Sequence, residues 1–435
     1  MTVTQAEIDK VVAESKRVLI GNHHSGICAW DGKLYECTFP SPTSYPFQWF
    51  WDSAFISIAL LHVDPALAKR EITCLLQGVQ PDGFMPHMLL WEKSSYLHWL
   101  EDEYSIRLAH PFYTGTTQPP VVARAIERIY DATKDLAFLR ETLEPTLRIF
   151  RWLKAVRDPD DDGLVCVIQP DETGLDASPK YDLAMGISHE RPEEVLPQLT
   201  RSMHRLFKAY EGIGLQREPL LDVFNFEDVM FNAIYADGLR ALARLCRIAG
   251  FPEGEAYECE QRYRRVRDAL VAKCWDEEAG AFWDLSGLRT ETPQKVLTFS
   301  IFFPIILPDL DRKIVRTLVE RHLLNEKEFW LPYPIPTVAA TEPSFDPAWK
   351  TNTTWRGPTW VNVNWYLYWG LLQHGFDDVA EELRSRTIGM IARGGVREFF
   401  DPRTAEGEGA KDFAWTCLAA DLAAAPTRSP ASTSV

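Results

Sequence analysis

The sequence has no long run of basic residues and no long hydrophobic segment. Its 435 residues include 46 Lys and Arg against 62 Asp and Glu, a formal net charge of -16, and Lys or Arg never occur more than two in a row. Nucleic acids and anionic membranes bind clustered positive charge, so neither is expected as a partner. The longest uncharged apolar run, residues 296–308, contains prolines and is too short to span a bilayer.

Metal-binding and nucleotide-binding motifs are also missing. The eight cysteines form no C-x-x-C pair and the ten histidines no H-x-x-x-H pair, so the spacing of a zinc site is absent. Neither a G-x-G-x-x-G segment nor a phosphate-binding loop occurs. Residues 1–20 have the pattern of an amphipathic helix and not of a signal peptide. These absences predict a cytoplasmic protein with reduced cysteines and without a metal or nucleotide cofactor.

What the sequence does contain is an alternation of two kinds of helix. Residues 52–63 are apolar on nearly every face, whereas the next helix should begin after Asp64 as N-cap, with Pro65 first, and carry one apolar stripe. Broadly apolar helices are expected again at 119–132, 223–250, 357–375 and 411–425, and one-sided helices at 136–156, 253–275 and 376–395. Alternating strand patterns are confined to short pieces at 163–169 and 281–288.

Helices buried on all sides, each followed by a helix buried on one side, indicate two concentric layers. We therefore predict an all-α fold, an (α/α)6 barrel of about six helix pairs with short β pieces in its loops. Residues 1–425 would form one domain with a lid insertion at about 158–205, and residues 426–435 have the composition of a disordered tail. A superhelical repeat stack is the alternative, but the sequence shows no fixed repeat period.

Tryptophan is abundant, with 15 copies, and several occur in clusters at residues 47–52 and 360–369. Aromatic walls with polar edges suit sugars, although bulky core packing accounts for such clusters equally well. In a double ring the loops before the inner helices line a funnel, and nearly all the polar-aromatic clusters fall in those loops. The sequence therefore predicts a ligand site at this end of the barrel.

Two loop carboxylates, Asp176 in ETGLDASP and Glu398 in GGVREFFDP, are the candidate catalytic pair. Hydrolysis of a glycosidic bond needs one carboxyl group that protonates the leaving oxygen and one that activates water or attacks directly. Both residues lie in Gly-containing loops beside apolar or aromatic neighbours, and partial desolvation there would raise a carboxyl pKa toward neutrality. The alternative for any single loop carboxylate is a helix cap or a solvated surface group.

Other polar residues have both a structural and a functional interpretation. Asp52 is expected to cap the buried helix, to accept hydrogen bonds from sugar hydroxyls, or both. Gln118, before two prolines, is either a turn residue or a ligand for neighbouring hydroxyls. Glu227 and Asp228 share an apolar helix and need a partner, for which we expect Arg356.

Six segments, taken in order, resemble the mannosylglycerate and glucosylglycerate hydrolases related to glycoside hydrolase family 63. They are YPFQWFWDSAF, GTTQPPV, ETGLDASPKYD, FNFEDVMFNAIY, TWRGPTWVNVNW and VREFFDPRTAEG, and they extend from residue 45 to about residue 408. The resemblance implies an (α/α)6 barrel and an inverting reaction without a metal or organic cofactor. It also implies that Asp176 is the general acid and Glu398 the general base.

Further residues in these segments are implied to surround the substrate: Tyr45, Trp49, Trp51, Asp52, Gln118, Tyr181, Trp355 and Arg356. Glu172 and Asp182 would then support the loop of residues 171–182 that carries Asp176, called the acid loop below, while Asp171 would face solvent. The expected substrate is a small α-glucoside or α-mannoside, with a glycerate glycoside as the leading choice. A homo-oligomer is compatible with the sequence.

The lid that follows the acid is expected to bind the aglycone. A glycerate carboxylate needs a cation or several donors, and we choose Arg191 for this role over His189 and Arg201. A surface ion pair of Arg191 with Glu193 or Glu194 is the alternative.

Other functions remain open beside the glycerate hydrolase. A neutral aglycone, as in an α-glucosidase or a trehalase-like hydrolase, fits the same acid and base. A sugar isomerase or epimerase on a similar barrel would instead depend on His87, His110 or His189. A sugar-binding protein without activity is the third alternative, and the presence of both Asp176 and Glu398 argues against it.

Overall fold

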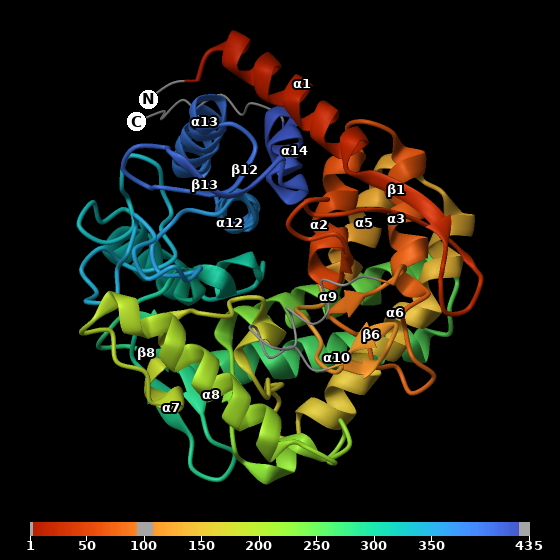
Figure 1. The fold of residues 1–435 in the computed structure, drawn as a ribbon, viewed down its shortest axis with the longest axis horizontal. Helices are drawn as coiled ribbons and strands as arrows, with labels where there is room; N and C mark the ends of the chain where they lie inside the picture. The colour runs from red at the N-terminus through yellow and green to blue at the C-terminus, as the bar shows by residue number, and fades with distance from the viewer. Residues whose placement is uncertain (1–2, 94–107, 426–435) are drawn as a thin grey trace.

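The computed structural model describes residues 3–93 and 108–425, and its helices form two concentric rings (Figure 1). Each inner element contacts the next, and the last contacts the first, which closes the ring. The inner elements are α2 (Phe50–Leu60), α5 (Val122–Thr133), α9 (Val229–Ala249), the 3-10 helix η6 (Phe299–Ile306), α12 (Val361–Gln373) and the 3-10 helix η8 (Ala414–Leu418), which continues into α14 (Ala419–Ala424). The predicted (α/α)6 barrel is confirmed.

The outer ring supplies one partner for each inner element. The outer elements are α3 (Pro65–Leu76), α6 (Leu136–Arg157), α10 (Glu253–Ala269) with the π-helical η5 (Leu270–Cys274), α11 (Arg312–Thr317) with the π-helical η7 (Leu318–Leu323), α13 (Asp377–Gly394) and α1 (Gln5–Gly21). Helix α1 closes this ring, because it packs against both α13 and the last inner element. The N-terminal helix is thus an outer-ring member.

Local sequence signals explain the helix boundaries. All residues of α2 are buried, as expected for an inner helix, while α3 begins after Asp64, whose side chain accepts a hydrogen bond from the Ala66 N–H. Asp135 caps α6 in the same way, and α9 ends at Gly250 with a φ of 75°, which favours glycine. The predicted cap at Asp64 is confirmed.

The fourth inner position was not predicted as a helix. Residues 296–308 contain Pro304, and the structure places a 3-10 helix there, fully buried between α9 and α12. Proline lacks a backbone N–H and disfavours a regular α-helix in its interior. A short 3-10 helix accommodates it, so this element fills the ring although its periodicity is not that of an α-helix.

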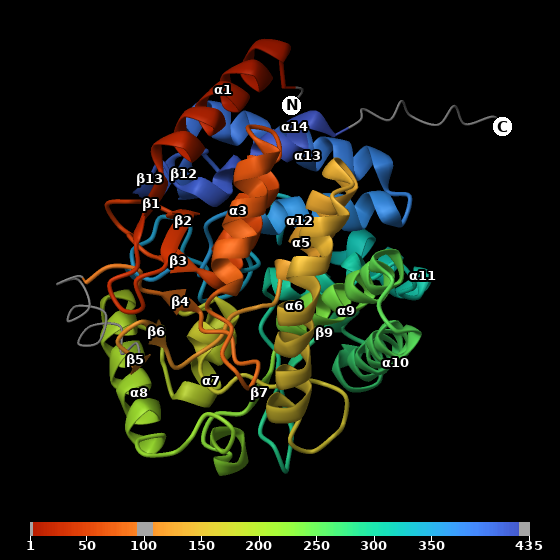
Figure 2. The same ribbon diagram turned by 90° about the vertical axis from the view of Figure 1, so that its right-hand side faces the viewer.

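The strands are short, and the two hairpins and the four-stranded sheet lie on one side of the ring, the side that faces the viewer in Figure 1 and lies at the left in Figure 2. They include the hairpins β1 (His23–Ile27) with β2 (Leu34–Thr38) and β12 (Arg397–Phe400) with β13 (Gly407–Lys411), and the sheet β3 (Gln48–Trp49), β4 (Met88–Leu89), β6 (Tyr113–Thr114), β5 (Leu108–His110). The other strands are β7 (Phe226–Glu227), β8 (Trp275–Asp276), β9 (Ala281–Phe282), β10 (Asp284–Ser286) and β11 (Thr292–Gln294). The strand pattern at 281–288 is confirmed, whereas 163–169 forms only an isolated bridge between Val167 and Phe226.

The predicted lid region, residues 158–205, consists of short helical elements and most of the 15-residue helix α8 (Val195–Ala209), which lies on the same side of the ring. The short elements are η1 (Pro170–Thr173), η2 (Pro179–Tyr181), α7 (Asp182–Met185) and η3 (Pro192–Glu194), and α8 is followed by η4 (Glu218–Leu221). The predicted tail, 426–435, lies outside the described residues. Among the helices of the described ranges, none has the length and apolar character that a bilayer span requires.

Candidate active site

A cavity of about 90 Å³ at the strand-bearing side of the barrel brings together most of the predicted site residues. They reach it from β3 and the loop before it, from α2, from the loop before α5, from the acid loop, from the loop before α12 and from β12. The predicted residues that line it are Tyr45, Trp49, Trp51, Asp52, Gln118, Asp176, Trp355 and Glu398. Segments more than 200 residues apart in the chain therefore meet at one site.

The cavity wall is aromatic. Trp355 stacks on Trp360 with ring centroids 3.9 Å apart and an interplanar angle of 8°, and Trp415 meets Trp51 edge to face at 5.2 Å. Trp360, Trp415 and Phe413 were not predicted as site residues, although Trp360 belongs to a cluster that the sequence singles out. Flat rings of this kind pack against the apolar faces of sugars.

Indole N–H groups add hydrogen-bond donors to this wall. In the described part of the chain, the buried Nε1 atoms of Trp49, Trp360 and Trp415 have no hydrogen-bond partner. A buried donor without a partner is costly, and a sugar hydroxyl in the cavity would satisfy it. The wall thus offers both stacking surface and unused polar atoms.

The acid loop holds Asp176 at the cavity with few polar neighbours. Burial raises the pKa of Asp176 to about 6, and a hydrogen bond from its own backbone opposes that rise. Gly174, two residues earlier, has a φ of 71°, and a Cβ atom there would lie 2.3 Å from Cζ2 of Trp51. Glycine is therefore required for the loop to approach the tryptophan wall so closely.

Glu172 anchors the start of this loop from behind. Its Oε1 accepts hydrogen bonds from Arg157 Nη2 at 2.6 Å and from the Thr117 N–H at 3.2 Å, and its Oε2 accepts one from the Ile168 N–H at 2.9 Å. Thr117 precedes Gln118, whose Oε1 accepts a hydrogen bond from the Trp51 N–H at 3.2 Å. One buried carboxylate thus connects the acid loop to the loop before α5.

Glu398 projects from β12 and receives two donors. Tyr45 Oη donates to its Oε1 at 2.9 Å, and the Ala410 N–H of the partner strand donates to its Oε2 at 2.7 Å. Burial raises the pKa of Glu398 to about 7 against the lowering effect of these donors, and the nearby charge of Asp176 adds to the rise. A buried carboxyl with two donors has a fixed orientation.

Asp52 is the third carboxyl of the cavity. Burial raises its pKa well above the ordinary value, and the nearby Glu398 and Asp176 add to this effect. The prediction that Asp52 caps the buried helix is wrong, because Trp49 occupies the N-cap position of α2 and Asp52 lies in the first turn. Its side chain lines the cavity, as its other predicted role, accepting hydrogen bonds from sugar hydroxyls, requires.

Three predicted binding residues do not line the cavity. The side chain of Tyr181 is buried, and its Oη contacts Thr173 Oγ1 at 2.7 Å and Asp228 Oδ2 at 2.9 Å. Arg356 is 1% exposed and is bound to Asp182. Arg191, with a side chain 71% exposed, lies 3.8 Å from Glu194, the ion pair that the sequence offers as the alternative to glycerate binding.

Two expectations about charged neighbours are wrong. Arg356 pairs with Asp182 and not with Glu227 or Asp228, because Asp228 Oδ2 contacts Lys180 Nζ at 2.5 Å. Asp171, expected to face solvent, is only 9% exposed, and its Oδ1 has no hydrogen-bond partner in the described residues. Burial and the neighbouring Asp176 raise the pKa of Asp171 well above its ordinary value.

A cluster of carboxylates elsewhere has the composition of a cation site. Asp160, Asp162, Glu227 and Glu291 offer oxygen atoms that all lie within 4.8 Å of one another. Lys273 Nζ already contacts Asp162, Glu291 at 2.7 Å and Glu227 at 3.3 Å. A lysine therefore provides a positive charge for this cluster, and its residues do not line the cavity described above.

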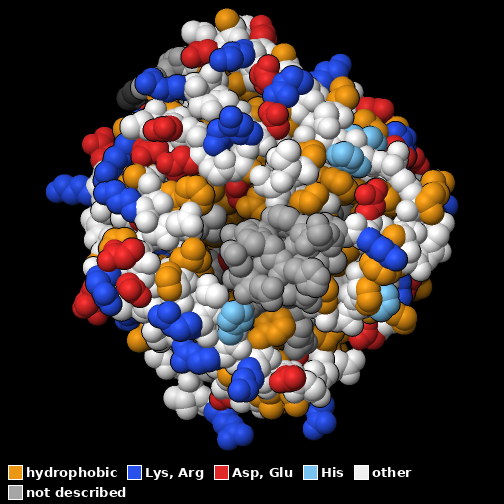
Figure 3. All heavy atoms as spheres, in the orientation of Figure 1, with side chains coloured by type: hydrophobic (Ala, Val, Ile, Leu, Met, Phe, Trp, Pro, Cys, Tyr) orange, Lys and Arg blue, Asp and Glu red, His pale blue; other side chains and the backbone are white. Residues whose placement is uncertain are grey.

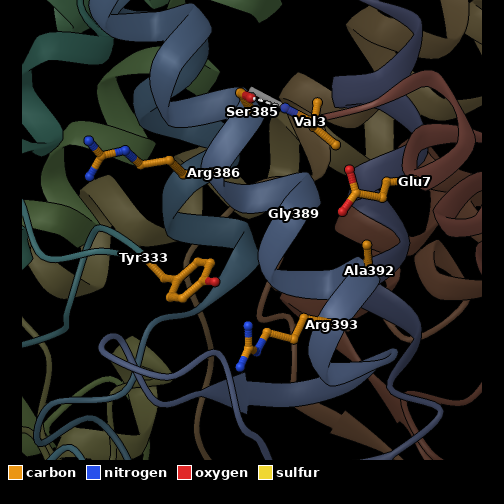
Figure 4. Close-up of a pocket in the computed structure, with 8 residues that line it drawn as sticks. All are labelled: Val3, Glu7, Tyr333, Ser385, Arg386, Gly389, Ala392 and Arg393. Carbon is orange, nitrogen blue, oxygen red and sulfur yellow. Dashed lines mark hydrogen bonds between the residues drawn. The ribbon is translucent and has the colours of Figure 1, made fainter. Parts of the chain in front are cut away.

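A second cavity, of about 230 Å³ between α1 and α13, differs in chemistry (Figure 4). Among its lining residues Glu7 is the single carboxylate, and the Thr4 N–H and Oγ1 both donate to it. Arg386 and Arg393 also line it. Because glycoside hydrolysis requires two carboxyl groups, the tryptophan-lined cavity is the candidate active site.

The histidines that an isomerase would need do not line the tryptophan-lined cavity in the described part of the chain. His87 is 1% exposed, contacts Thr116 through Nδ1 and has a pKa lowered to about 3 by burial. His189 Nδ1 lies 3.6 Å from Asp182 Oδ2 and its side chain is 38% exposed, and His110 is exposed. The arrangement thus supports carboxyl chemistry.

Comparison with known proteins decides the family. A family model described as the mannosylglycerate hydrolase MGH1-like glycoside hydrolase domain matches residues 45–416. The chain belongs to this glycoside hydrolase family. The prediction of a glycosidase related to glycoside hydrolase family 63 is confirmed.

Named hydrolases from other organisms are similar to the chain over most of its length. A mannosylglycerate hydrolase from Thermus thermophilus is 34% identical over 88% of this chain and 95% of its own. A glucosylglycerate hydrolase from Mycolicibacterium hassiacum is 26% identical over 89% of this chain and 93% of its own. A crystal structure of a Thermus thermophilus mannosylglycerate hydrolase, in complex with Tris and D-glycerate, has a TM-score of 0.80 at 30% identity and covers 94% of this chain and 99% of its own.

Proposed function

We propose that this glycoside hydrolase cleaves a small α-glucoside or α-mannoside with inversion, and that glucosylglycerate or mannosylglycerate is its leading substrate. The observation that carries the proposal is the meeting of Asp176 and Glu398 in one tryptophan-lined cavity, both with pKa values raised by burial. The names of the similar proteins, mannosylglycerate hydrolase and glucosylglycerate hydrolase, support the choice of substrate.

Asp176 is proposed as the general acid and Glu398 as the general base. In this reaction Glu398 takes a proton from a water molecule, whose oxygen bonds to the anomeric carbon on the face opposite the leaving group. The glycosidic bond breaks, and the leaving oxygen takes the proton of Asp176. An α-glycoside therefore yields a β-sugar and a free alcohol.

The two carboxyl groups differ mainly in the hydrogen bonds that they receive. The pKa values of about 6 for Asp176 and about 7 for Glu398 lie close together. Donors from Tyr45 and Ala410 stabilise the anionic form of Glu398, whereas among the residues that the structure describes Asp176 has only its own backbone donor. The two pKa values already include these donors, and the higher value of Glu398 places a shared proton there before substrate binds, so the choice of Asp176 as the acid follows from the resemblance of its sequence motif.

A neutral aglycone is the second candidate, and one observation favours it. The cavity-lining residues within 3–93 and 108–425 include neither Lys nor Arg, although they include three carboxylates. A glycerate carboxylate needs a cation or several donors, which must then come from outside this set. Arg191 remains a prediction for that role. Charges of both signs are interspersed on the described surface around the cavity side of the molecule (Figure 3).

The test is a substrate panel followed by proton NMR. The purified protein is incubated with glucosylglycerate, mannosylglycerate, their glycerol analogues, trehalose and maltose-type disaccharides. Initial release of the β-anomer from a glycerate substrate is the expected result. Release from neutral substrates alone would retain the mechanism and remove glycerate, and initial release of the α-anomer would exclude inversion.

We also propose a cytoplasmic location. All eight cysteines are buried and free, as expected of a protein kept under reducing conditions. Cell fractionation with a tagged chain tests this, and recovery from the extracellular fraction would contradict it.

A further inference from the structure

The ion pair between Asp182 and Arg356 is buried just outside the cavity. Arg356 Nη1 donates to Asp182 Oδ2 at 2.8 Å and Arg356 Nη2 to Oδ1 at 2.6 Å, so the contact is bidentate. The side chains are 9% and 1% exposed. A bidentate contact fixes both distance and orientation, because the guanidinium fork and the carboxylate are planar.

Each partner is joined to a different wall of the cavity. Asp182 ends the segment that begins with Asp176 and begins α7. Arg356 follows Trp355, whose indole lines the cavity and whose φ of 64° is unusual for a residue with a side chain. Such a backbone conformation persists only where surrounding contacts hold it. The pair therefore connects the acid loop to the tryptophan wall.

We infer that the Asp182–Arg356 ion pair positions the general acid by holding the acid loop at a fixed distance from the Trp355 wall. The inference rests on the proposed function, and it gives Arg356 a positioning role in place of contact with the sugar. A sugar packed on the tryptophan wall has its glycosidic oxygen at a set place. Asp176 must reach that oxygen, and a misplacement of about 1 Å costs on the order of 100-fold in rate.

A separate network keeps the loop folded without this pair. Lys180 Nζ contacts Asp228 Oδ2 at 2.5 Å, Ser300 Oγ at 3.0 Å and Asp284 Oδ1 at 3.5 Å. These contacts attach the acid loop to α9, η6 and β10. Loss of the Asp182–Arg356 pair should therefore shift the loop and not unfold it, which makes the effect on positioning measurable.

The experiment compares two substrates in the Asp182→Asn/Arg356→Gln double variant. Removing both charges avoids the unpaired buried charge that either single variant leaves. One substrate is the α-glycoside with an alkyl leaving group that the wild type cleaves, and the other is the matching α-glycosyl fluoride. Fluoride leaves with little need for protonation, so its hydrolysis does not depend on correct placement of Asp176.

We expect kcat for the alkyl glycoside to fall about 100-fold with KM within about threefold, while kcat for the fluoride stays within about threefold. The Arg356→Lys variant, which keeps the charge and loses the fork, should be intermediate. If the double variant does not fold, the Arg356→Lys variant, which leaves no unpaired charge, carries the test of the same substrate difference.

A matched control uses another buried ion pair. Arg262 Nη2 lies 2.7 Å from Asp158 Oδ2, and both side chains are 4% exposed or less, but neither lines the cavity. The Asp158→Asn/Arg262→Gln variant should lower Tm and leave both kcat values unchanged.

Three outcomes would overturn the inference. Wild-type kcat on both substrates in the Asp182→Asn/Arg356→Gln variant would show that the pair has no positioning role. An equal loss on both substrates would indicate general damage to the site. Absence of hydrolysis by the wild type would contradict the proposed function itself, and the inference with it, whereas the first two outcomes leave that function intact.

Discussion

The acid loop at 171–182 and the base hairpin, residues 397–411, hold their carboxyl groups in different ways. The acid loop is anchored by buried ion pairs of Glu172, Lys180 and Asp182 with distant residues, while Asp176 itself receives no side-chain donor among the described residues. The base hairpin is held by strand pairing, and Glu398 itself receives donors from Tyr45 and Ala410. In the acid loop the contacts fix the backbone that carries Asp176, whereas in the base hairpin hydrogen bonds also fix the side chain of Glu398.

This difference fits the two proposed tasks. A general acid has to give up its proton to the leaving oxygen, so strong donors that favour its anion would work against it. A general base has to be anionic and aimed at a water molecule, so donors help it. Fixing the loop from behind places Asp176 without stabilising its charged form.

The largest effect is expected from Glu398→Gln, which removes the base. We expect kcat to fall by about 10³- to 10⁴-fold on both the alkyl glycoside and the glycosyl fluoride, because both need an activated water. Steady-state kinetics with both substrates provide the measurement, with Tm as the folding control. If the fluoride were still hydrolysed at the wild-type rate, Glu398 would not be the base.

Asp176→Asn should separate the two substrates. The expected loss of kcat on the alkyl glycoside is about 10²- to 10³-fold, and on the fluoride below about tenfold, since only the first leaving group needs a proton. Parallel assays of Asp176→Asn and Glu398→Gln make the comparison direct. Equal losses in Asp176→Asn would refute its role as the acid.

Gly174→Ala tests the close approach of the acid loop to the wall. The new Cβ would lie 2.3 Å from Trp51 Cζ2, so the loop must move, and we expect a fall in kcat of about 10- to 100-fold. Gly186→Ala is the control, because Gly186 has a similar φ of 67° but nothing within 4 Å of the added atom. The control should lose stability alone. Equal kcat values in the two variants would contradict the steric argument.

Tyr45→Phe should have the smallest effect, a shift of the pH profile. Removing the Oη donor at 2.9 Å destabilises the anion of Glu398, so its pKa, already raised to about 7, rises further. A base must be deprotonated, so the acid limb of kcat/KM should move to higher pH, by about one unit. An unchanged acid limb would show that Tyr45 does not control the ionisation of Glu398.

The fold could be predicted because burial leaves a local pattern. The apolar faces of residues 52–63 and the single stripe after Asp64 reveal inner and outer helices within one or two turns. Residues 296–308 escaped prediction as an inner helix, because Pro304 interrupts the α-helical pattern in a uniformly apolar run.

The site could be predicted in part for the same reason. Asp176, Glu398 and the residues 49–52 occur in distinctive segments, and the cavity brings them together. Trp415 was missed because one tryptophan in an apolar helix has no local feature that separates the site from the core.

The sequence by itself determined the double ring, the family and the two carboxyl groups at its funnel, because helix periodicity and short motifs depend on neighbouring residues. Only the tertiary structure decided which charges meet. Arg356 was expected to pair with Glu227 or Asp228 but forms an ion pair with Asp182. Tyr181 was expected at the sugar but donates a hydrogen bond to Asp228. The physical reason is that an ion pair depends on the distance between two atoms after folding, and residues 182 and 356 approach each other only when the ring closes.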